Sequence, residues 1–270
     1  MSIVRTLRIL ASQRPTLPPR AVAAPSRVER RRPGSIPVTW IDRHLAGTAT
    51  IVHLHGGAYV AGETKVHWEW LEEVGRRSGA ATAMIHYRLA PTYPYPAAIE
   101  DVLRAIDTMA QDSQLRPGSW VLSGDSSGAG LALAVTQSLA RAGRDTPALL
   151  LLESLWADLR PQIDAQGFLG TAARLYAGSV PVENPRLSPL LGDLGSLPPV
   201  HLVTGSEDMV VEDSRRLHAG ITEAGGTVRY LEVPGEGHMV AVAGEGPAAQ
   251  AARRTQIEAI HDAVAITAAT

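Results

Sequence analysis

One serine stands in a setting that suits nucleophilic chemistry. Ser126 lies at the centre of the sequence GDSSG, residues 124–128, between a strand predicted over 119–123 and a helix predicted over 128–142. Such a strand–turn–helix exposes the serine hydroxyl at the strand's end, and the helix start favours developing negative charge. The same pattern also fits a glycine-rich turn with a capping serine. The motif therefore needs partners before it indicates catalysis.

A serine becomes a useful nucleophile when a neighbouring base takes its proton. His238 is the best candidate, because it follows a strand predicted over 227–233 within the loop sequence PGEGH. A histidine at the carboxyl end of a late strand can reach over the sheet edge toward Ser126. Histidines on predicted strands and helices are expected to be structural: His53, His86, His201, His218 and His261.

The base in turn needs a carboxylate that orients it and stabilises its charged form. Asp208 follows a strand predicted over 199–204, with Glu207 as the adjacent competitor. Glu212 and Asp213 are expected at the start of the next helix, where carboxylates cap and interact with the helix dipole. The order Ser126, Asp208, His238 differs from the orders of the chymotrypsin and subtilisin types.

The third requirement is a set of donors for the oxyanion. The sequence HGGA at 55–58 follows a strand predicted over 48–54. Small residues here expose backbone N–H groups, so Gly56, Gly57 and Ala58, together with the N–H of Ser127, form the predicted oxyanion hole. Alone, the loop would fit a tight turn with glycine at positive φ.

Strands and helices alternate along the rest of the chain, which predicts an α/β fold with a mostly parallel sheet covered on both faces. Further strands are expected over 38–44, 81–87 and 147–155, and further helices over 68–77, 96–109, 214–224 and 248–268. The charge run 29–32 predicts a solvated strand or loop, and 3–10 a short helix. An insertion, 157–197, with a helical segment at 170–177, interrupts the alternation and predicts a lid or binding wall.

Composition excludes several classes of protein. The chain has 270 residues, no cysteine and a formal net charge of −2, so disulfides, thiolate nucleophiles and Cys-ligated zinc are absent. Near-neutral charge argues against a nucleic-acid partner, and no apolar run is long enough to span a membrane. The start of the chain has no cleavage pattern of a signal peptide, so we expect a cytoplasmic protein. The length fits a single domain, 1–270.

The combined motifs HLHGGAYV, YRLAPTYPYPAAIED, GDSSGAG and GSEDMVVEDS resemble the hormone-sensitive-lipase-like branch of the α/β-hydrolases, the bacterial carboxylesterases. The resemblance implies the α/β-hydrolase fold, an eight-stranded, mostly parallel sheet flanked by helices, with a small helical cap from about 1–27 and 157–197. It implies a catalytic triad of Ser126, Asp208 and His238. It further implies hydrolysis of short- to medium-chain acyl esters through an acyl-enzyme, with neither cofactor nor metal, and a homodimer. Arg88 and Asp101 match scaffold positions of this branch.

The chain also departs from the family pattern, with Ala58 in place of a third glycine and Leu155 in place of a proline. These differences concern substrate preference more than mechanism. Tyr59, Leu169 and Tyr176 are expected to line the acyl site. An amidase or formamidase on the same triad and a non-catalytic binding protein on a hydrolase scaffold remain alternatives. A true lipase is disfavoured, because the sequence shows no large apolar lid helix.

Overall fold

The computed structural model describes residues 12–268, which fold around a single eight-stranded sheet. Its strands are β1 (Val28–Arg31), β2 (Val38–Ile41), β3 (Thr50–Leu54), β4 (Ala81–Ile85), β5 (Trp120–Asp125), β6 (Leu149–Glu153), β7 (Val200–Gly205) and β8 (Val228–Val233). They lie in the order β1-β2-β4-β3-β5-β6-β7-β8. The pairs β1–β2 and β2–β4 are antiparallel, and every other pair is parallel. The predicted mostly parallel, eight-stranded sheet is confirmed.

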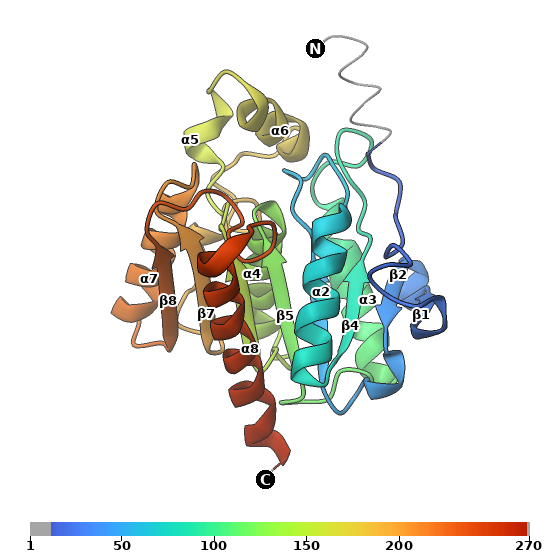
Figure 1. Cartoon of the computed structure of the whole chain (residues 1–270). Coiled ribbons are helices and arrows are strands. Elements are labelled where there is room, and N and C mark those ends of the chain that lie inside the picture. The colour runs from blue at the N-terminus through green and yellow to red at the C-terminus, as the bar shows by residue number, and fades with distance from the viewer. Residues whose placement is uncertain (1–11, 269–270) are drawn as a thin grey trace.

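Helices cover both faces of this sheet (Figure 1). They are α2 (Lys65–Ser78), α3 (Ala97–Gln111), α4 (Ser127–Arg141), α5 (Arg160–Ile163), α6 (Phe168–Ala177), α7 (Val211–Glu223) and α8 (Gly246–Ala268). Helices α2 and α8 pack together on one face, and α3, α4 and α7 cover the other. Across residues 12–268, none of the helices combines the length and the apolar composition that crossing a membrane requires.

The central strands are apolar on both sides because both sides are buried. In β6, Leu150 and Leu152 join the cluster beneath α3 and α4, whereas Leu149 and Leu151 join the cluster beneath α2 and α8. Strand β3 alternates in the same way, with Val52 in the first cluster. This two-sided packing holds the carboxyl ends of the strands in a fixed row, and the candidate catalytic residues follow those ends.

Most predicted elements are present, with shifted ends. The strand expected over 38–44 stops at Ile41, because Asp42 adopts a left-handed conformation (φ 53°) before a short 3₁₀ turn. The helix expected from residue 68 begins three residues earlier, at Lys65, where Thr64 and His67 form a capping box. The charge run at 29–32 falls largely on edge strand β1. The helix expected over 3–10 lies outside the described residues.

The insertion 157–197 lies at the carboxyl edge of the sheet. It contains α5, α6 and a 3₁₀ turn, Pro189–Leu191, and Figure 1 shows α5 and α6 above the ends of the strands. The predicted small helical cap is therefore present. The share of the cap expected from 1–27 stays a prediction, because 1–11 lie outside the described part of the chain.

Candidate active site

Ser126 occupies a strained turn between β5 and α4. Its backbone has φ 52° and ψ −121°, a region that non-glycine residues rarely adopt. The flanking glycines permit this turn, because chain segments pass very close to it. A Cβ on Gly124 would lie 2.4 Å from the carbonyl oxygen of Gly128, and a Cβ on Gly128 would lie 2.0 Å from that of Leu54. The turn has the backbone geometry that the motif predicts for a nucleophile, and Ser126 is buried at the end of β5.

Two other strand ends bring a histidine and an aspartate to this serine. His238 Nε2 lies 3.0 Å from Ser126 Oγ, and His238 Nδ1 lies 2.8 Å from Asp208 Oδ1. A carboxylate only accepts hydrogen bonds, so the network assigns the proton to Nδ1. Nε2 is then free to accept the serine proton. The structure thus brings the three predicted residues together in the arrangement of a nucleophile, a base and an orienting acid.

The electrostatics of the pair suit these roles. Burial raises the pKa of Asp208, but hydrogen bonds from His238, Ser154 and the N–H of Val210 outweigh it, and the pKa lies below its ordinary value. Burial lowers the pKa of His238, but the hydrogen bond and negative charge of Asp208 raise it above 6.5. Asp208 therefore stays ionised and favours a protonated His238, which is the form a general base adopts after taking a proton.

The competing carboxylates lie elsewhere. Glu207 is exposed beside Asp208. Asp213 lies in the first turn of α7, yet its carboxylate does not cap that helix: it accepts the N–H groups of Ala157 and Asp158 at 2.8 and 2.9 Å. Burial raises the pKa of Asp213 to about 6. The expected place of Glu212 and Asp213 at the start of α7 is confirmed. The expected capping by Asp213 is wrong, because its carboxylate instead anchors the start of the insertion.

The loop after β3 is built for backbone donors. Gly57, Ala58 and Tyr59 all have positive φ, at 120°, 55° and 62°. Within residues 12–268, no acceptor is found for the N–H groups of Gly57, Ala58 or Ser127. These three amides are therefore available for an oxyanion.

Gly56 differs from the prediction that placed it among the oxyanion residues. Its N–H donates to Oδ2 of Asp125 at 3.0 Å and is therefore already engaged. A Cβ at this position would lie 2.2 Å from the same carboxylate oxygen. Gly56 supports the loop rather than offering a free donor.

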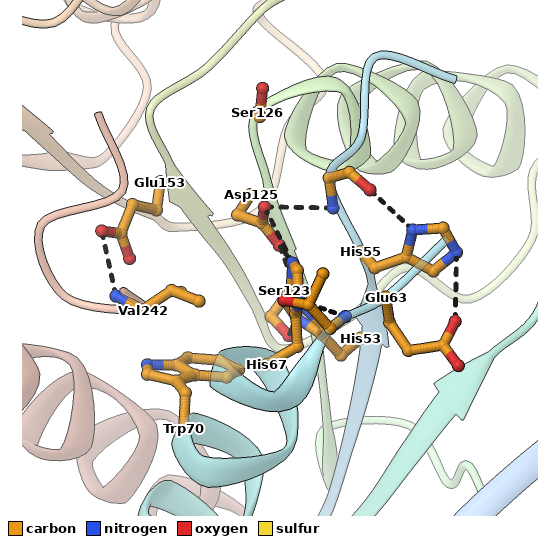
Figure 2. Close-up of polar contacts among 12 residues, drawn as sticks. His53, His55, Glu63, His67, Trp70, Ser123, Asp125, Ser126, Glu153 and Val242 are labelled. Atoms are coloured by element: carbon orange, nitrogen blue, oxygen red, sulfur yellow. Dashed lines mark hydrogen bonds and ion pairs between the residues drawn. The ribbon is translucent and has the colours of Figure 1, made fainter. Parts of the chain in front are cut away.

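A buried polar network lies beneath the serine turn (Figure 2). Asp125 Oδ1 lies 3.1 Å from His53 Nε2, and Asp125 Oδ2 lies 3.4 Å from His67 Nε2. Burial raises the pKa of Asp125, but the positive charge of His67 and the hydrogen bonds from both histidines lower it by more. Burial lowers the pKa of His53, whereas Asp125 raises that of His67. Nδ1 of His67 accepts the N–H of Thr64 at 3.0 Å, so its proton lies on Nε2 and is donated to the ionised carboxylate of Asp125.

Sequence reasoning missed His67 in this network. A signal was present, because a histidine three residues after Thr64 fits a capping box at the start of a helix. The expected structural histidines are engaged as well: His86 with Thr39 and Glu63, and His201 with Thr255. Within residues 12–268, no group of three or more histidine or carboxylate side chains is placed to hold a metal ion.

The residues expected to line the acyl site connect the loop after β3 to the cap. The rings of Tyr59 and Tyr176 stack with centroids 3.7 Å apart and an interplanar angle of 3°. Both side chains are buried, and Leu169 is half-buried at the start of α6. The Tyr59 N–H donates to Ser127 Oγ at 3.2 Å. The pair thus fixes the cap against the turn that carries Ser126.

The sequence of the chain is similar to those of several known proteins. A family model described as alpha/beta hydrolase fold matches residues 51–242. An acetyl-hydrolase of Streptomyces hygroscopicus is 35% identical over 219 residues, which cover 76% of this chain and 73% of that protein. An esterase of Acinetobacter venetianus is 30% identical over 203 residues, or 70% and 67% of the two chains.

Solved structures show the same similarity. An esterase/lipase from an uncultured bacterium superimposes with a TM-score of 0.81 at 26% identity, covering 98% of this chain and all of that one (100%). EstE5, soaked with p-nitrophenyl butyrate, superimposes with a TM-score of 0.78 at 26% identity and covers 97% and 98% of the two chains.

Proposed function

Because the chain belongs to the hormone-sensitive-lipase-like branch of the α/β-hydrolases and is a carboxylic ester hydrolase, we propose that it hydrolyses short- to medium-chain acyl esters through an acyl-enzyme on Ser126. One observation carries the proposal: Ser126 Oγ lies 3.0 Å from His238 Nε2, whose other ring nitrogen is held by Asp208. A hydroxyl in that position can lose its proton at the moment it attacks a carbonyl.

The first half of the reaction acylates the serine. Ser126 Oγ attacks the ester carbonyl carbon while His238 Nε2 takes the hydroxyl proton. The carbonyl oxygen becomes negative and accepts hydrogen bonds from the N–H groups of Gly57, Ala58 and Ser127. The C–O bond to the alcohol then breaks, and protonated His238 gives its proton to the leaving alkoxide.

The second half releases the acid. Water attacks the acyl-serine carbonyl as His238 Nε2 takes a proton from it, and the same three amides stabilise the second oxyanion. Collapse of this intermediate breaks the bond to Ser126 Oγ, which regains its proton from His238. Asp208 remains ionised throughout and stabilises the imidazolium in both halves.

Substitution of the nucleophile tests the proposal. Ser126→Ala should abolish turnover of p-nitrophenyl acetate and butyrate while the thermal unfolding midpoint stays close to that of the unsubstituted protein. Ser138→Ala is the matched control, because its hydroxyl lies on the same helix and donates to the carbonyl of Ala134. It should retain full activity. Turnover by Ser126→Ala would overturn the assignment.

Two further measurements separate the alternatives. A fluorophosphonate should label Ser126 covalently, as a working serine hydrolase requires; a folded protein that resists labelling would instead be a binding protein. Matched esters and amides of the same acyl group should show higher kcat/KM for the esters. The opposite preference would indicate an amidase.

A further inference from the structure

Glu153 is a buried carboxylate beside the active site that the proposed reaction does not use. It ends β6 and is 2% exposed. Its Oε1 accepts the N–H groups of Ala241 and Val242 at 2.5 and 3.2 Å, and its Oε2 accepts Nε2 of Gln256 at 3.1 Å. Figure 2 shows Glu153 reaching from its strand toward Val242. The side chain therefore holds the turn that begins directly after His238.

The same short segment also holds the nucleophile. The carbonyl oxygen of Glu153 accepts the N–H of Ser126 at 2.9 Å. The next residue, Ser154, accepts the N–H of Met239 on its hydroxyl at 2.7 Å. One strand end thus fixes the serine through its backbone and the turn after the histidine through two side chains. The 3.0 Å distance between Ser126 and His238 depends on both attachments.

The directions of the hydrogen bonds identify the protonation state of Glu153. The indole of Trp70 can only donate, and it lies 2.9 Å from Oε1 of Gln256. The NH₂ of Gln256 must then face Glu153, where it donates to Oε2. Every partner of the Glu153 side chain is a donor, so the ionised carboxylate is the form that satisfies all of them.

We propose that ionised Glu153 is a positioning residue. It holds the turn after His238 so that His238 stays within hydrogen-bond distance of Ser126. The inference rests on the proposed esterase function, since it assigns a role within that site. Glu153 acts through the backbone at 241 and 242 and touches no reacting atom.

The charged groups around Glu153 make its positioning role depend on pH. Asp125 faces it from β5, His238 lies at the start of the turn, and Arg253 of α8 donates to the carbonyl oxygens of Ala241 and Gly244. On α2, Glu73 pairs with Arg253. Burial raises the pKa of Glu153 to about 7, and Glu153 in turn helps to raise that of His238. Acidification below neutral pH therefore weakens the attachment as it protonates the base.

Glu153→Gln is the direct test. Its amide can accept from the turn, but its own NH₂ then faces the NH₂ of Gln256, so the turn loosens. We expect kcat to fall by about 10- to 100-fold, since a displacement near 1 Å has that effect, while KM stays within about twofold. The acid-side pKa of kcat/KM should also fall, because a negative charge near His238 is lost.

The double variant Glu153→Gln with Gln256→Glu should rescue the activity lost in Glu153→Gln. The amide introduced at position 153 then donates to the carboxylate introduced at position 256, which also accepts from Trp70, and every donor is again satisfied. This double variant should recover most of kcat while keeping a lowered acid-side pKa. Asp101→Asn is the matched control, because that buried carboxylate also accepts a backbone N–H, from Arg88. It should lower the unfolding midpoint and leave the pH profile unchanged.

The outcomes distinguish the role of Glu153 from the esterase function itself. If Ser126→Ala is inactive and folded Glu153→Gln matches the unsubstituted protein in kcat and acid-side pKa, the role of Glu153 is wrong and the esterase function stands. If Glu153→Gln does not fold, the double variant decides, and an unchanged acid-side pKa there overturns the inference. Turnover by Ser126→Ala would overturn the function itself.

Discussion

The carboxylate of Asp125 accepts the backbone N–H of Gly56 at 3.0 Å. This bond joins the residue before the proposed nucleophile to the loop that carries two of the proposed oxyanion donors. The attacking group and the groups that receive the negative charge are therefore held at a fixed separation. Preorganised donors of this kind need no rearrangement when charge develops.

Asp125→Ala should damage both stability and activity. It leaves the Nε2–H groups of His53 and His67 and the N–H of Gly56 buried without their acceptor. The free energy of unfolding should therefore fall by about 3 kcal/mol or more, since each unsatisfied buried donor costs about 1–3 kcal/mol. Urea denaturation measures this loss. Ser123→Ala is the control, because it removes one hydroxyl partner of His53 and should cost about 1–3 kcal/mol. Equal losses in the two variants would contradict the role of Asp125 as the shared acceptor of these donors.

The pH dependence of activity should report His238. The base must be neutral to accept a proton, and its pKa lies above 6.5, so kcat/KM should fall as pH decreases through a midpoint above 6.5. Asp208→Asn should lower that midpoint and reduce kcat by roughly 10⁴-fold, because the imidazole loses the partner that sets its tautomer. Steady-state kinetics between pH 5 and 9 test both effects, and an unchanged midpoint in Asp208→Asn would contradict the pairing.

The contact between Asp125 and His67 should make stability depend on pH. The folded pKa of His67 is raised, so its contribution is complete below the unfolded value of about 6.5 and is lost as pH rises through the folded value. The folded pKa of Asp125 is lowered, so its contribution is present above about 3.9 and is lost on acidification. The destabilisation caused by His67→Gln should therefore be largest between about pH 4 and 6.5. Urea unfolding at pH 5 and pH 9 should give a smaller difference at pH 9, and equal differences would refute a raised pKa for His67.

Gly128→Ala should be among the most damaging small substitutions. The new methyl group would lie 2.0 Å from the carbonyl oxygen of Leu54, and neither backbone segment can move without disturbing β3 or α4. We expect a loss of about 3 kcal/mol or more, beyond the usual range for overpacking. Gly143→Ala is the comparison, since it adds only left-handed strain with nothing within 4 Å, and should cost about 1–2 kcal/mol. Thermal unfolding of both variants decides the point.

The stacked tyrosines should influence acyl-chain preference. Tyr176→Ala removes the ring that joins the cap to Tyr59 and opens space near the serine turn. The kcat/KM ratio of octanoate to acetate esters should rise by about tenfold or more, since each methylene in a pocket is worth that order of discrimination. Tyr176→Phe keeps the stack and should keep the ratio. An identical acyl profile in the alanine variant would remove Tyr176 from the acyl site.

The sequence predicts the strand ends well because those signals are local. The glycines around Ser126 and the loops that carry Asp208 and His238 each follow an apolar run, and the parallel sheet then places the ends side by side. The order of elements and the insertion follow from the same periodicity. Apolar spacing places the start of α2 too late, because the signal there is a polar cap.

Contacts between distant segments could not be predicted in this way. Glu153 bonds to backbone 88 residues away, and Asp213 to backbone 56 residues away. Gly56 appears in the sequence as a free donor, but a carboxylate 69 residues away engages its N–H. In each case one of the two bonded groups belongs to the main chain, which every residue type carries, so residue identity gives no clue to the pairing.

The sequence separation of 112 residues from Ser126 to His238 also affects how activity returns during refolding. The nucleophile and the oxyanion loop belong to central strands β3 and β5, whereas the base follows edge strand β8, which pairs with β7. Closing such long loops is slow relative to local structure formation. A chain diluted from denaturant should therefore regain esterase activity no earlier than β8 joins the sheet, so enzymatic turnover reports completion of the fold rather than formation of its core.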